Sequence, residues 1–228
     1  MRKDKINAAI GIFIIVVIFL AVSYLVQSNL DYVRSLIGVS PTSMIIYILI
    51  LIFATVVAPV NATPLLPVAS NIWGWFLTGI LTIIGETIGS IIAFSLARKY
   101  GVPLVKKFVP INDIAKYEKL IPEGNIFWSI VFLRISVPVD ILSYILGLFS
   151  RVKFKTYFFA TLIGISPLAF ILAYIGTLSI FYQIITFITA VLIILLGYII
   201  GKKYKRKKLM KESIKESMEN VKSEKYLS

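Results

Sequence analysis

The chain contains no cysteine and no histidine, and only 15% of its 228 residues are charged. The absence of cysteine excludes disulfide bonds and thiolate nucleophiles. The absence of histidine removes the most frequent general base and a frequent zinc or haem ligand. The remaining carboxylates lack a paired acid–base context, and the chain has no recognised phosphate-binding loop. We therefore expect no enzyme, and neither a cofactor nor a bound metal.

What the sequence does contain is uninterrupted apolar blocks. Its composition is 58% hydrophobic, with a mean hydropathy of +0.90. Blocks of about 20 apolar residues are long enough to cross a bilayer. They predict about four membrane-spanning helices, at residues 1–27, 72–97, 154–176 and 180–201. Residues 21–23 resemble a signal-peptide cleavage site, but the first block is longer than a signal peptide needs, so we expect it to be retained.

Two further apolar stretches, at residues 43–70 and 126–149, are broken near their centres. Proline cannot continue a helix, and it also disfavours helical geometry in the residue before it. In each stretch the limbs on either side of the break are short. The residues expected to shape these two breaks are Pro59, Pro64 and Pro67 in the first, and Pro138 and Gly147 in the second.

The net charge is +13, from 24 lysine and arginine residues against 11 acidic ones. Such a balance is typical of proteins that bind nucleic acid or a membrane surface. Here the charges lie between and after apolar blocks, so we expect anionic lipid headgroups as partners, and no nucleic acid. The basic run at 202–208 is interpreted as a cytoplasmic anchor, with specific lipid recognition as the alternative.

The distribution of basic residues decides between two topologies, because cytoplasmic loops carry an excess of lysine and arginine. If every apolar block crossed the membrane once, six basic residues would lie outside: Arg98, Lys99, Lys106, Lys107, Lys116 and Lys119. If the two broken stretches instead enter and return on the same side, 22 of the 24 basic residues become cytoplasmic. Only Arg34 then lies outside, and Arg134 lies within the membrane.

The predicted fold is therefore an all-α integral membrane protein of the cell membrane, with two opposed re-entrant helical hairpins. Each hairpin precedes a long helix, so the core at residues 43–177 reads as an inverted repeat. Both termini are cytoplasmic, and residues 202–228 form a basic tail. Broken segments in corresponding positions of two inverted halves point to a transport site near the bilayer midplane.

Glu86 is the one acidic residue of the 72–97 helix. It belongs to a stripe in which a polar residue recurs at every fourth position: Thr78, Thr82, Glu86 and Ser90. A second stripe of small residues runs beside it: Gly85, Gly89, Ala93 and Ala97. Small residues allow close helix packing, so this stripe is expected to contact a hairpin. An ionisable residue at this depth is costly and suggests a function. The alternative is a buried polar group that fixes packing.

Arg134 and Asp140 flank the second break, where an arginine could receive a phosphate group. The alternative is a salt bridge that only holds the hairpin together. In the first break the polar side chains are Asn61 and Thr63. They form a glycosylation sequon, but Pro64 follows it and the segment is expected to be buried, so we interpret them as binding residues.

The sequence resembles a known family over roughly residues 45–177. The motifs are NIWGWFLTG at 71–79, GETIGSIIAFSLARKYG at 85–101 and RISVPVD at 134–140, followed by GISP at 164–167. They resemble the SNARE-associated Golgi protein domain, also called the VTT domain, whose bacterial and archaeal branch is the DedA superfamily. The resemblance implies opposed re-entrant hairpins, with Arg134 and Arg98 at the positions of two family arginines. It also implies phospholipid scrambling or recycling of polyprenyl-phosphate carriers.

Our leading hypothesis is a translocase or scramblase for a phosphate-bearing lipid. One alternative is a proton-coupled carrier of small solutes or ions that uses Glu86. The first hairpin lacks the acidic residues of bacterial DedA proteins, with Asn61 and Thr63 there instead, which puts a DedA-like proton pathway in doubt. A further alternative is a membrane scaffold whose basic tail recruits partners.

The topology predicts that Lys106 and Lys116 face the cytoplasm. Single cysteines at these two positions, in a chain that has none of its own, should react with a membrane-impermeant maleimide only after the cells are opened. A cysteine at Arg34 should react in intact cells and serves as the positive control. Labelling of position 106 or 116 from outside would contradict the two hairpins.

Overall fold

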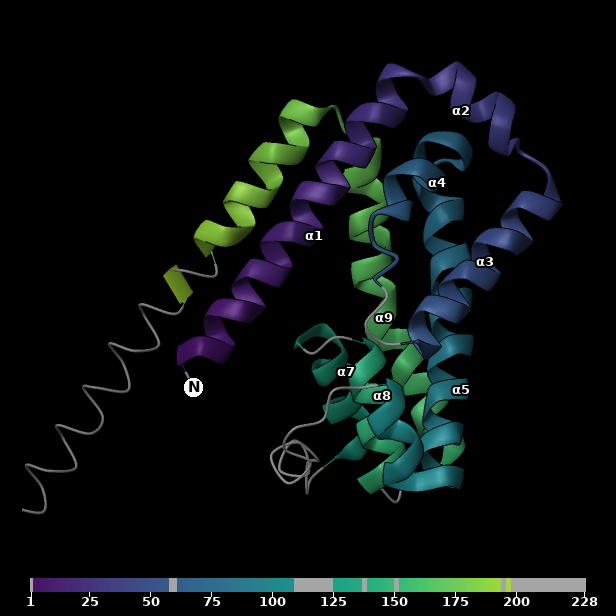
Figure 1. The fold of residues 1–228 in the computed structure, drawn as a ribbon, viewed down its shortest axis with the longest axis vertical. Helices are drawn as coiled ribbons and strands as arrows, with labels where there is room; N and C mark the ends of the chain where they lie inside the picture. The colour runs from purple at the N-terminus through teal and green to yellow at the C-terminus, as the bar shows by residue number, and fades with distance from the viewer. Residues whose placement is uncertain are drawn as a thin grey trace, which may run out of the picture. The chain divides into compact units, whose positions relative to one another are not determined.

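The computed structural model describes residues 2–57, 61–108, 125–136, 139–149, 152–193 and 196–197. Every regular element within them is an α-helix, as the sequence predicts (Figure 1). The elements are α1 Arg2–Ser28, α2 Leu30–Ile37, α3 Pro41–Val56, α4 Leu65–Trp73, α5 Trp75–Phe108, α7 Ile126–Ser136, α8 Val139–Phe149 and α9 Phe154–Thr177. Another apolar helix covers Ile180–Ile193. The chain divides into two compact units, Met1–Gln183 and Ile184–Ser228.

Two helices are long and apolar enough to cross a bilayer by themselves: α5, over Trp75–Pro103, and α9. The end of α1 and all of α2 pass the same test only together, and they are bent by 94° at their junction. The described residues therefore give two or three candidate spans where the sequence predicts about four. Within the last predicted span, 180–201, the continuous described helix stops at Ile193.

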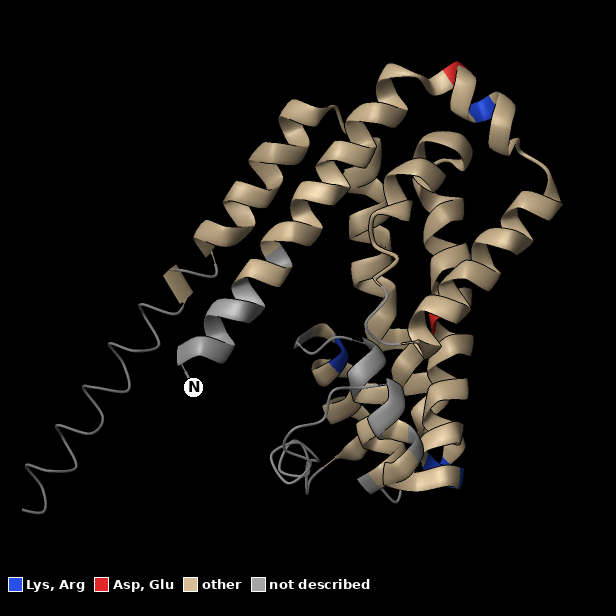
Figure 2. Cartoon of the chain, viewed as in Figure 1, with Lys and Arg blue, Asp and Glu red and all other residues tan. Residues whose placement is uncertain are grey.

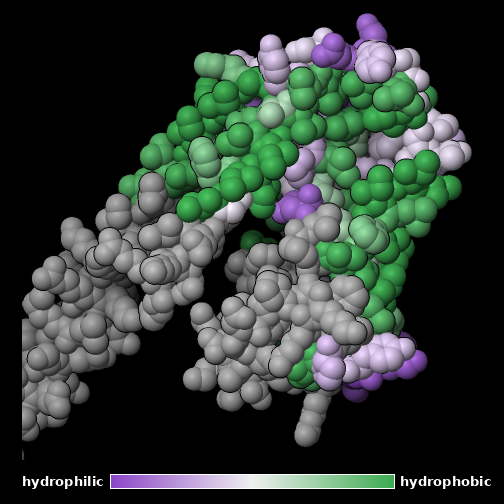
Figure 3. Space-filling view, in the orientation of Figure 1, coloured by the Kyte–Doolittle hydropathy of each residue, from purple (hydrophilic) through white to green (hydrophobic). Residues whose placement is uncertain are grey.

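Helix α2 lies outside every helix that the sequence predicts. Leu30–Ile37 is amphipathic, with Asp31 and Arg34 among apolar residues, and a strongly amphipathic helix of this kind is typical of a bilayer interface. It ends at Gly38, whose φ of 72° requires a residue without a Cβ. Figure 2 shows charge on α2 at one end of the core and on α5 at the other. The described surface between these ends is mostly hydrophobic in Figure 3.

Helices α3 and α4 start and finish at the same end of the first unit. The indole Nε1 of Trp73, the last residue of α4, donates to the carbonyl of Gly38 just before α3, over 3.3 Å. The Trp73 ring also meets Tyr47 of α3 edge to face, with 5.5 Å between centroids. The two helices therefore run out from this end and back to it.

The prolines of the first break act differently from what the sequence suggested. They were expected to end helices, but Pro64 is the N-cap of α4 and Pro67 lies in its first turn. The first N–H groups of a helix have no intrahelical acceptor, so proline removes no hydrogen bond there. Pro64 and Pro67 therefore begin the second helix of the pair. Pro59 and Pro138 lie outside the described residues.

The second pair, α7 and α8, packs on the two long helices, α7 against α9 and α8 against α5. A core cluster joins these four helices: Phe94, Ile130, Val131, Leu142, Leu146, Val152, Tyr157 and Ala160. The hydroxyl of Tyr144 in α8 donates to the carbonyl of Val56, the last residue of α3. The second pair of helices therefore touches the far end of the first.

The small-residue stripe of α5 makes the close contacts predicted for it. A Cβ at Gly85 would lie 2.8 Å from Leu51 Cβ, and one at Gly89 would lie 2.7 Å from Thr55 Cβ, both on α3. Further along the stripe, Ala97 meets Gly147 of α8, where an added Cβ would lie 2.4 Å from the Phe94 carbonyl oxygen. Gly147 is thus a close-contact site within α8, two residues before its end.

Gly147→Ala should destabilise the protein by about 1–3 kcal/mol, because the added methyl group meets backbone atoms of α5 that cannot rotate away. Thermal unfolding in detergent measures this as a lower Tm. Gly11→Ala is the matched control, since nothing lies within 4 Å of an added Cβ there. Equal melting temperatures for the two variants would show that α8 does not pack this closely on α5.

Candidate functional site

The site is built around Arg134, near the end of α7, whose side chain is only 2% exposed. Its Nη2 donates to the Tyr157 hydroxyl over 2.7 Å and to the Thr161 hydroxyl over 3.0 Å. Tyr157 and Thr161 are one turn apart on α9 and are fully buried. One nitrogen of the guanidinium group is therefore held by two neutral oxygens that α9 presents side by side.

The Tyr157 hydroxyl also connects this pair to the third helix of the site. It donates its proton to the carbonyl of Ser90 in α5, over 3.0 Å. A phenolic oxygen can accept from one group while it donates to another, so both of its hydrogen-bonding functions are used here. Arg134 is thereby fixed to both long helices. This offsets part of the several kcal/mol that burial of a charged group costs.

An aromatic column runs from Arg134 to the exposed Arg98. The Arg98 Cζ atom lies 4.3 Å from the Phe94 ring centroid. Phe94 stacks on Tyr157 with 3.9 Å between centroids and 16° between planes. On Tyr157 the Arg134 Cζ atom lies 5.4 Å from the centroid. The two arginines singled out by the family resemblance therefore sit at opposite ends of one stack, where ring faces attract both cations.

Arg98 also ties α5, three residues before its break at Gly101, to the segment just before α9. Its Nη1 donates to the Val152 carbonyl over 3.0 Å. Because Lys153 and Lys155 follow immediately, four basic residues gather at this end of the core: Arg98, Lys99, Lys153 and Lys155. At the opposite end Arg34 donates to the Asn71 carbonyl over 3.1 Å. Asn71 in turn donates to the carbonyl of Gly176, near the end of α9, over 2.8 Å.

Gly164 allows Arg134 to reach its partners on α9. An added Cβ at this position would lie 2.7 Å from Arg134 Cβ and 3.2 Å from the carbonyl oxygen of Val131. A larger residue at 164 would push α7 away from α9. The hydrogen bonds from Arg134 to Tyr157 and Thr161 depend on this close approach.

Glu86 lies on another part of α5 and is half-buried. Thr82, one turn before it, is buried and shares a hydrogen bond of 2.8 Å with Tyr47 of α3. The polar stripe of α5 therefore forms hydrogen bonds with two neighbouring helices. Thr82 bonds to α3, and the Ser90 carbonyl accepts from α9. Along the same helix, the hydroxyl groups of Thr78, Thr87 and Ser90 are buried with no hydrogen-bond partner among the described residues.

The remaining predicted site residues are not gathered around Arg134 in the described contacts. Asn61 is exposed, and its Oδ1 accepts from the Thr63 backbone N–H over 2.8 Å, which forms a local turn before α4. Asp140 is in the first turn of α8, but its side chain lies outside the described part of the chain. The predicted pairing of Arg134 with Asp140 therefore stays a prediction.

Sequence reasoning missed the residues that hold Arg134. Tyr157 and Thr161 stand one turn apart in a mostly apolar span, at the spacing used to recognise the Glu86 stripe. The same test applied to residues 154–176 would have selected them. Phe94 carries no such signal, because a phenylalanine in an apolar span is ordinary. Its role comes only from where the packing of α5 on α9 places it.

Comparison with family models gives one match, to the VTT domain, over residues 59–178. Comparisons with curated proteins and with solved structures find no match. The matched region contains α4, α5, α7, α8 and α9, and thus every residue of the Arg134 site and the aromatic column. Proteins with this domain are membrane-associated and linked to transport and lipid handling. The chain, just over half of which is matched, therefore belongs to the VTT-domain family, the domain of the DedA and SNARE-associated Golgi proteins.

Proposed function

We propose that this protein translocates a phosphate-bearing lipid, a phospholipid or a polyprenyl-phosphate carrier, across the cell membrane. The observation that carries the proposal is the nearly complete burial of Arg134 between two long apolar helices. An arginine stays cationic in proteins, so its charge is present at this depth. A buried ionisable group in a membrane bundle marks a substrate or ion path.

The guanidinium group of Arg134 is able to bind an anionic ligand. Its Nη2 donates to the hydroxyl oxygens of Tyr157 and Thr161. A lipid phosphate is a stronger partner, because charge-assisted hydrogen bonds are roughly twice as strong as neutral ones. The planar guanidinium group also matches two phosphate oxygens at once. The phosphate would replace one hydroxyl group, and Tyr157 and Thr161 would receive the arginine again after release.

We further propose that both helix pairs are re-entrant hairpins. The hydrogen bond between Trp73 and Gly38 supports this for the first pair, since it brings the start of α3 and the end of α4 together at one face. For the second pair, the hydrogen bond from Arg98 to Val152 places the chain that leaves α8 at the opposite face. The contact of Tyr144 with Val56 supports a meeting of the two pairs inside the core. From the excess of basic residues we propose that the Arg98 end is cytoplasmic, and from the sequence that both termini are cytoplasmic.

In this scheme the headgroup moves along α5 while the lipid tails stay in the bilayer. The buried hydroxyl groups of Thr87 and Ser90, one turn apart on α5, would offer it hydrogen bonds. Movement of α8 away from α3 would open the path, because the Tyr144–Val56 contact closes it. Glu86 and Asp140 would tune the electrostatic potential around Arg134, and Asn61 and Thr63 would contact the headgroup at the first hairpin.

The half-buried carboxyl group of Glu86 supports proton-coupled transport as the second candidate. A proton carrier needs an ionisable group at membrane depth. Lipid or solute movement that follows an imposed pH gradient, and loses this dependence in Glu86→Gln, would favour that function. A scaffold remains the third candidate, and deletion of residues 202–228 would abolish its activity but not that of a translocase.

Arg134→Ala should lower the movement of fluorescent phospholipids in reconstituted liposomes at least about tenfold, because charged hydrogen bonds of about 1.5–3 kcal/mol are lost. Arg134→Lys keeps the charge without the planar fork and should give an intermediate rate. Lys99→Ala, an exposed cation near the end of α5, is the control. Unchanged transport in folded Arg134→Ala protein would remove this residue from the mechanism, and wild-type liposomes no faster than empty ones would end the proposal.

Tyr157→Phe should reduce transport and lower stability by about 1.5–3 kcal/mol, because a buried guanidinium group loses an acceptor. The ring and its stacking on Phe94 are retained, so the change isolates the hydroxyl group. Tyr174→Phe is the matched control on the same helix, where the tyrosine is half exposed. Its stability should stay within about 0.5 kcal/mol of wild type. Equal Tm values for the two variants would contradict the role of Tyr157.

A further inference from the structure

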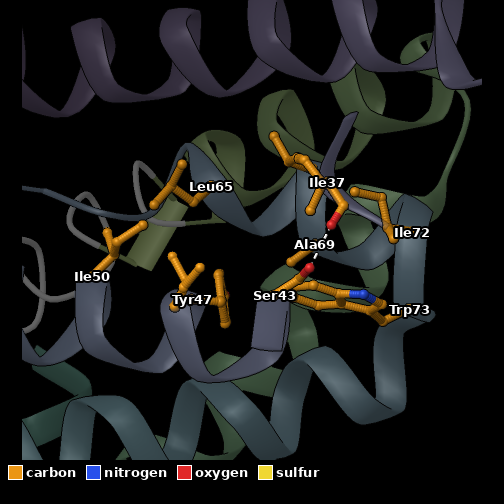
Figure 4. Close-up of a pocket in the computed structure, with 10 residues that line it drawn as sticks. Ile37, Ser43, Tyr47, Ile50, Leu65, Ala69, Ile72 and Trp73 are labelled. Carbon is orange, nitrogen blue, oxygen red and sulfur yellow. Dashed lines mark hydrogen bonds between the residues drawn. The ribbon is translucent and has the colours of Figure 1, made fainter. Parts of the chain in front are cut away.

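An apolar cavity of about 180 Å³ lies at the α2 end of the first unit, away from Arg134 (Figure 4). It is enclosed by the end of α2, the first half of α3 and most of α4. Its lining residues are Ile37, Ser43, Ile46, Tyr47, Ile50, Leu65, Val68, Ala69, Ile72 and Trp73. Neither the family match nor the proposed translocation assigns a role to it.

The polar side chains of the lining are already engaged with protein groups. Ser43 Oγ donates to the Ile37 carbonyl, the Tyr47 hydroxyl bonds to Thr82, and Trp73 Nε1 donates to the Gly38 carbonyl. A buried water needs two to four polar partners, and truly apolar cavities stay dry. The cavity therefore suits a hydrocarbon group better than water or a polar ligand.

One side of the cavity is continuous with the lipid-facing surface of α3. Ile46 and Ile50 line the cavity and are still 52% and 43% exposed. The same helix exposes Ile45, Leu49 and Phe53. In a membrane these side chains meet acyl chains, so a chain can enter the cavity sideways from the bilayer. The bilayer lipid around the opening can therefore supply the hydrocarbon chain.

A cation lies on the helix that contributes Ile37 to the cavity lining. Arg34 is exposed on α2, one turn before Ile37, and one of its donors is used on the Asn71 carbonyl. Asp31, one turn earlier, is the only acidic residue of α2. Because α2 is amphipathic and turns 94° away from α1, it suits a position along the bilayer surface. The cavity would then lie just below the headgroup layer, with Arg34 at headgroup level.

We propose that this cavity binds the upper part of one acyl chain of an anionic phospholipid, and that Arg34 contacts its phosphate. The volume suits a short stretch of chain, because a cavity of about 150 Å³ holds one benzene ring. The proposal needs only the membrane location of the protein and does not depend on lipid translocation. A lipid held here links α2 to the α3–α4 pair from the side.

Tryptophan fluorescence tests the acyl-chain contact, because Trp73 lines the cavity and the chain has three tryptophans. The Trp75→Phe, Trp128→Phe double variant leaves Trp73 as the only tryptophan, which is excited selectively over the tyrosines at long wavelength. We expect phosphatidylglycerol vesicles with bromine atoms on the upper acyl chain to quench it at least twofold. Absence of quenching would mean that no lipid chain enters, and that another occupant, such as a second copy of this chain, keeps lipid out.

A blocking variant separates chains in the cavity from chains at the surface. Ala69→Leu, or the milder Val68→Phe, fills the cavity and should remove most of the Trp73 quenching. In the matched control, Trp73→Phe and Trp128→Phe leave Trp75, which is 42% exposed and outside the cavity. Its quenching should persist with either blocking change, which also shows correct insertion. Trp73 quenching that survives both blocking changes would overturn the proposal.

The headgroup contact is tested by lipid competition. Unbrominated phosphatidylglycerol should relieve Trp73 quenching more effectively than phosphatidylcholine. The Arg34→Gln change should reduce this preference about fivefold, the effect of one basic residue near a membrane surface. Lys99→Gln, at the other end of the core, should leave it unchanged. An equal response to the two lipids in the unaltered Arg34 protein would exclude a preference for anionic lipid, and a preference that survives Arg34→Gln would exclude the contact with Arg34.

Discussion

A guanidinium group inside an apolar bundle needs hydrogen-bond acceptors, and this need organises the core around Arg134. Water is scarce at such depth, so acceptors must come from neighbouring helices. Tyr157 and Thr161 provide two, and Tyr157 passes the connection on to the Ser90 carbonyl of α5. Helix α7 is too short to cross a membrane by itself. These bonds join it to both long helices.

These hydrogen bonds are possible because the helices approach closely. The close approach depends on glycines, which have no side chain. Gly164 allows Arg134 to lie against the surface of α9, and Gly147 allows α8 to pack against the backbone of α5. Gly85 and Gly89 do the same for α3. Between helices in lipid, the gain comes from van der Waals contact and interhelical hydrogen bonds, since apolar surface is not removed from water there. One helix, α5, thus serves as the common support of both helix pairs.

The two ends of the core differ in chemistry. Around Arg134 and Arg98, charge is combined with stacked aromatic rings and buried hydroxyl groups. Near α2, an exposed arginine stands beside a cavity whose polar groups are all engaged. The first arrangement suits a phosphate and the second suits a hydrocarbon chain, and a lipid contains both. On the two proposals above, this protein would bind a headgroup phosphate near Arg134 and an acyl chain near α2.

The sequence alone determined the helical class, the broken stretches and the long helices α5 and α9, and it singled out Arg134. These follow from local properties, namely the length of apolar runs, proline positions and the cost of buried charge. Arg98 was singled out only by the family resemblance. Tertiary structure decided which neighbours complete the site. Tyr157, Phe94 and Gly164 contact residues that are 23 to 67 positions away along the chain, and no local pattern specifies such contacts. It also decided that Pro64 and Pro67 begin α4, because the role of a proline depends on whether the N–H it lacks would have had an acceptor.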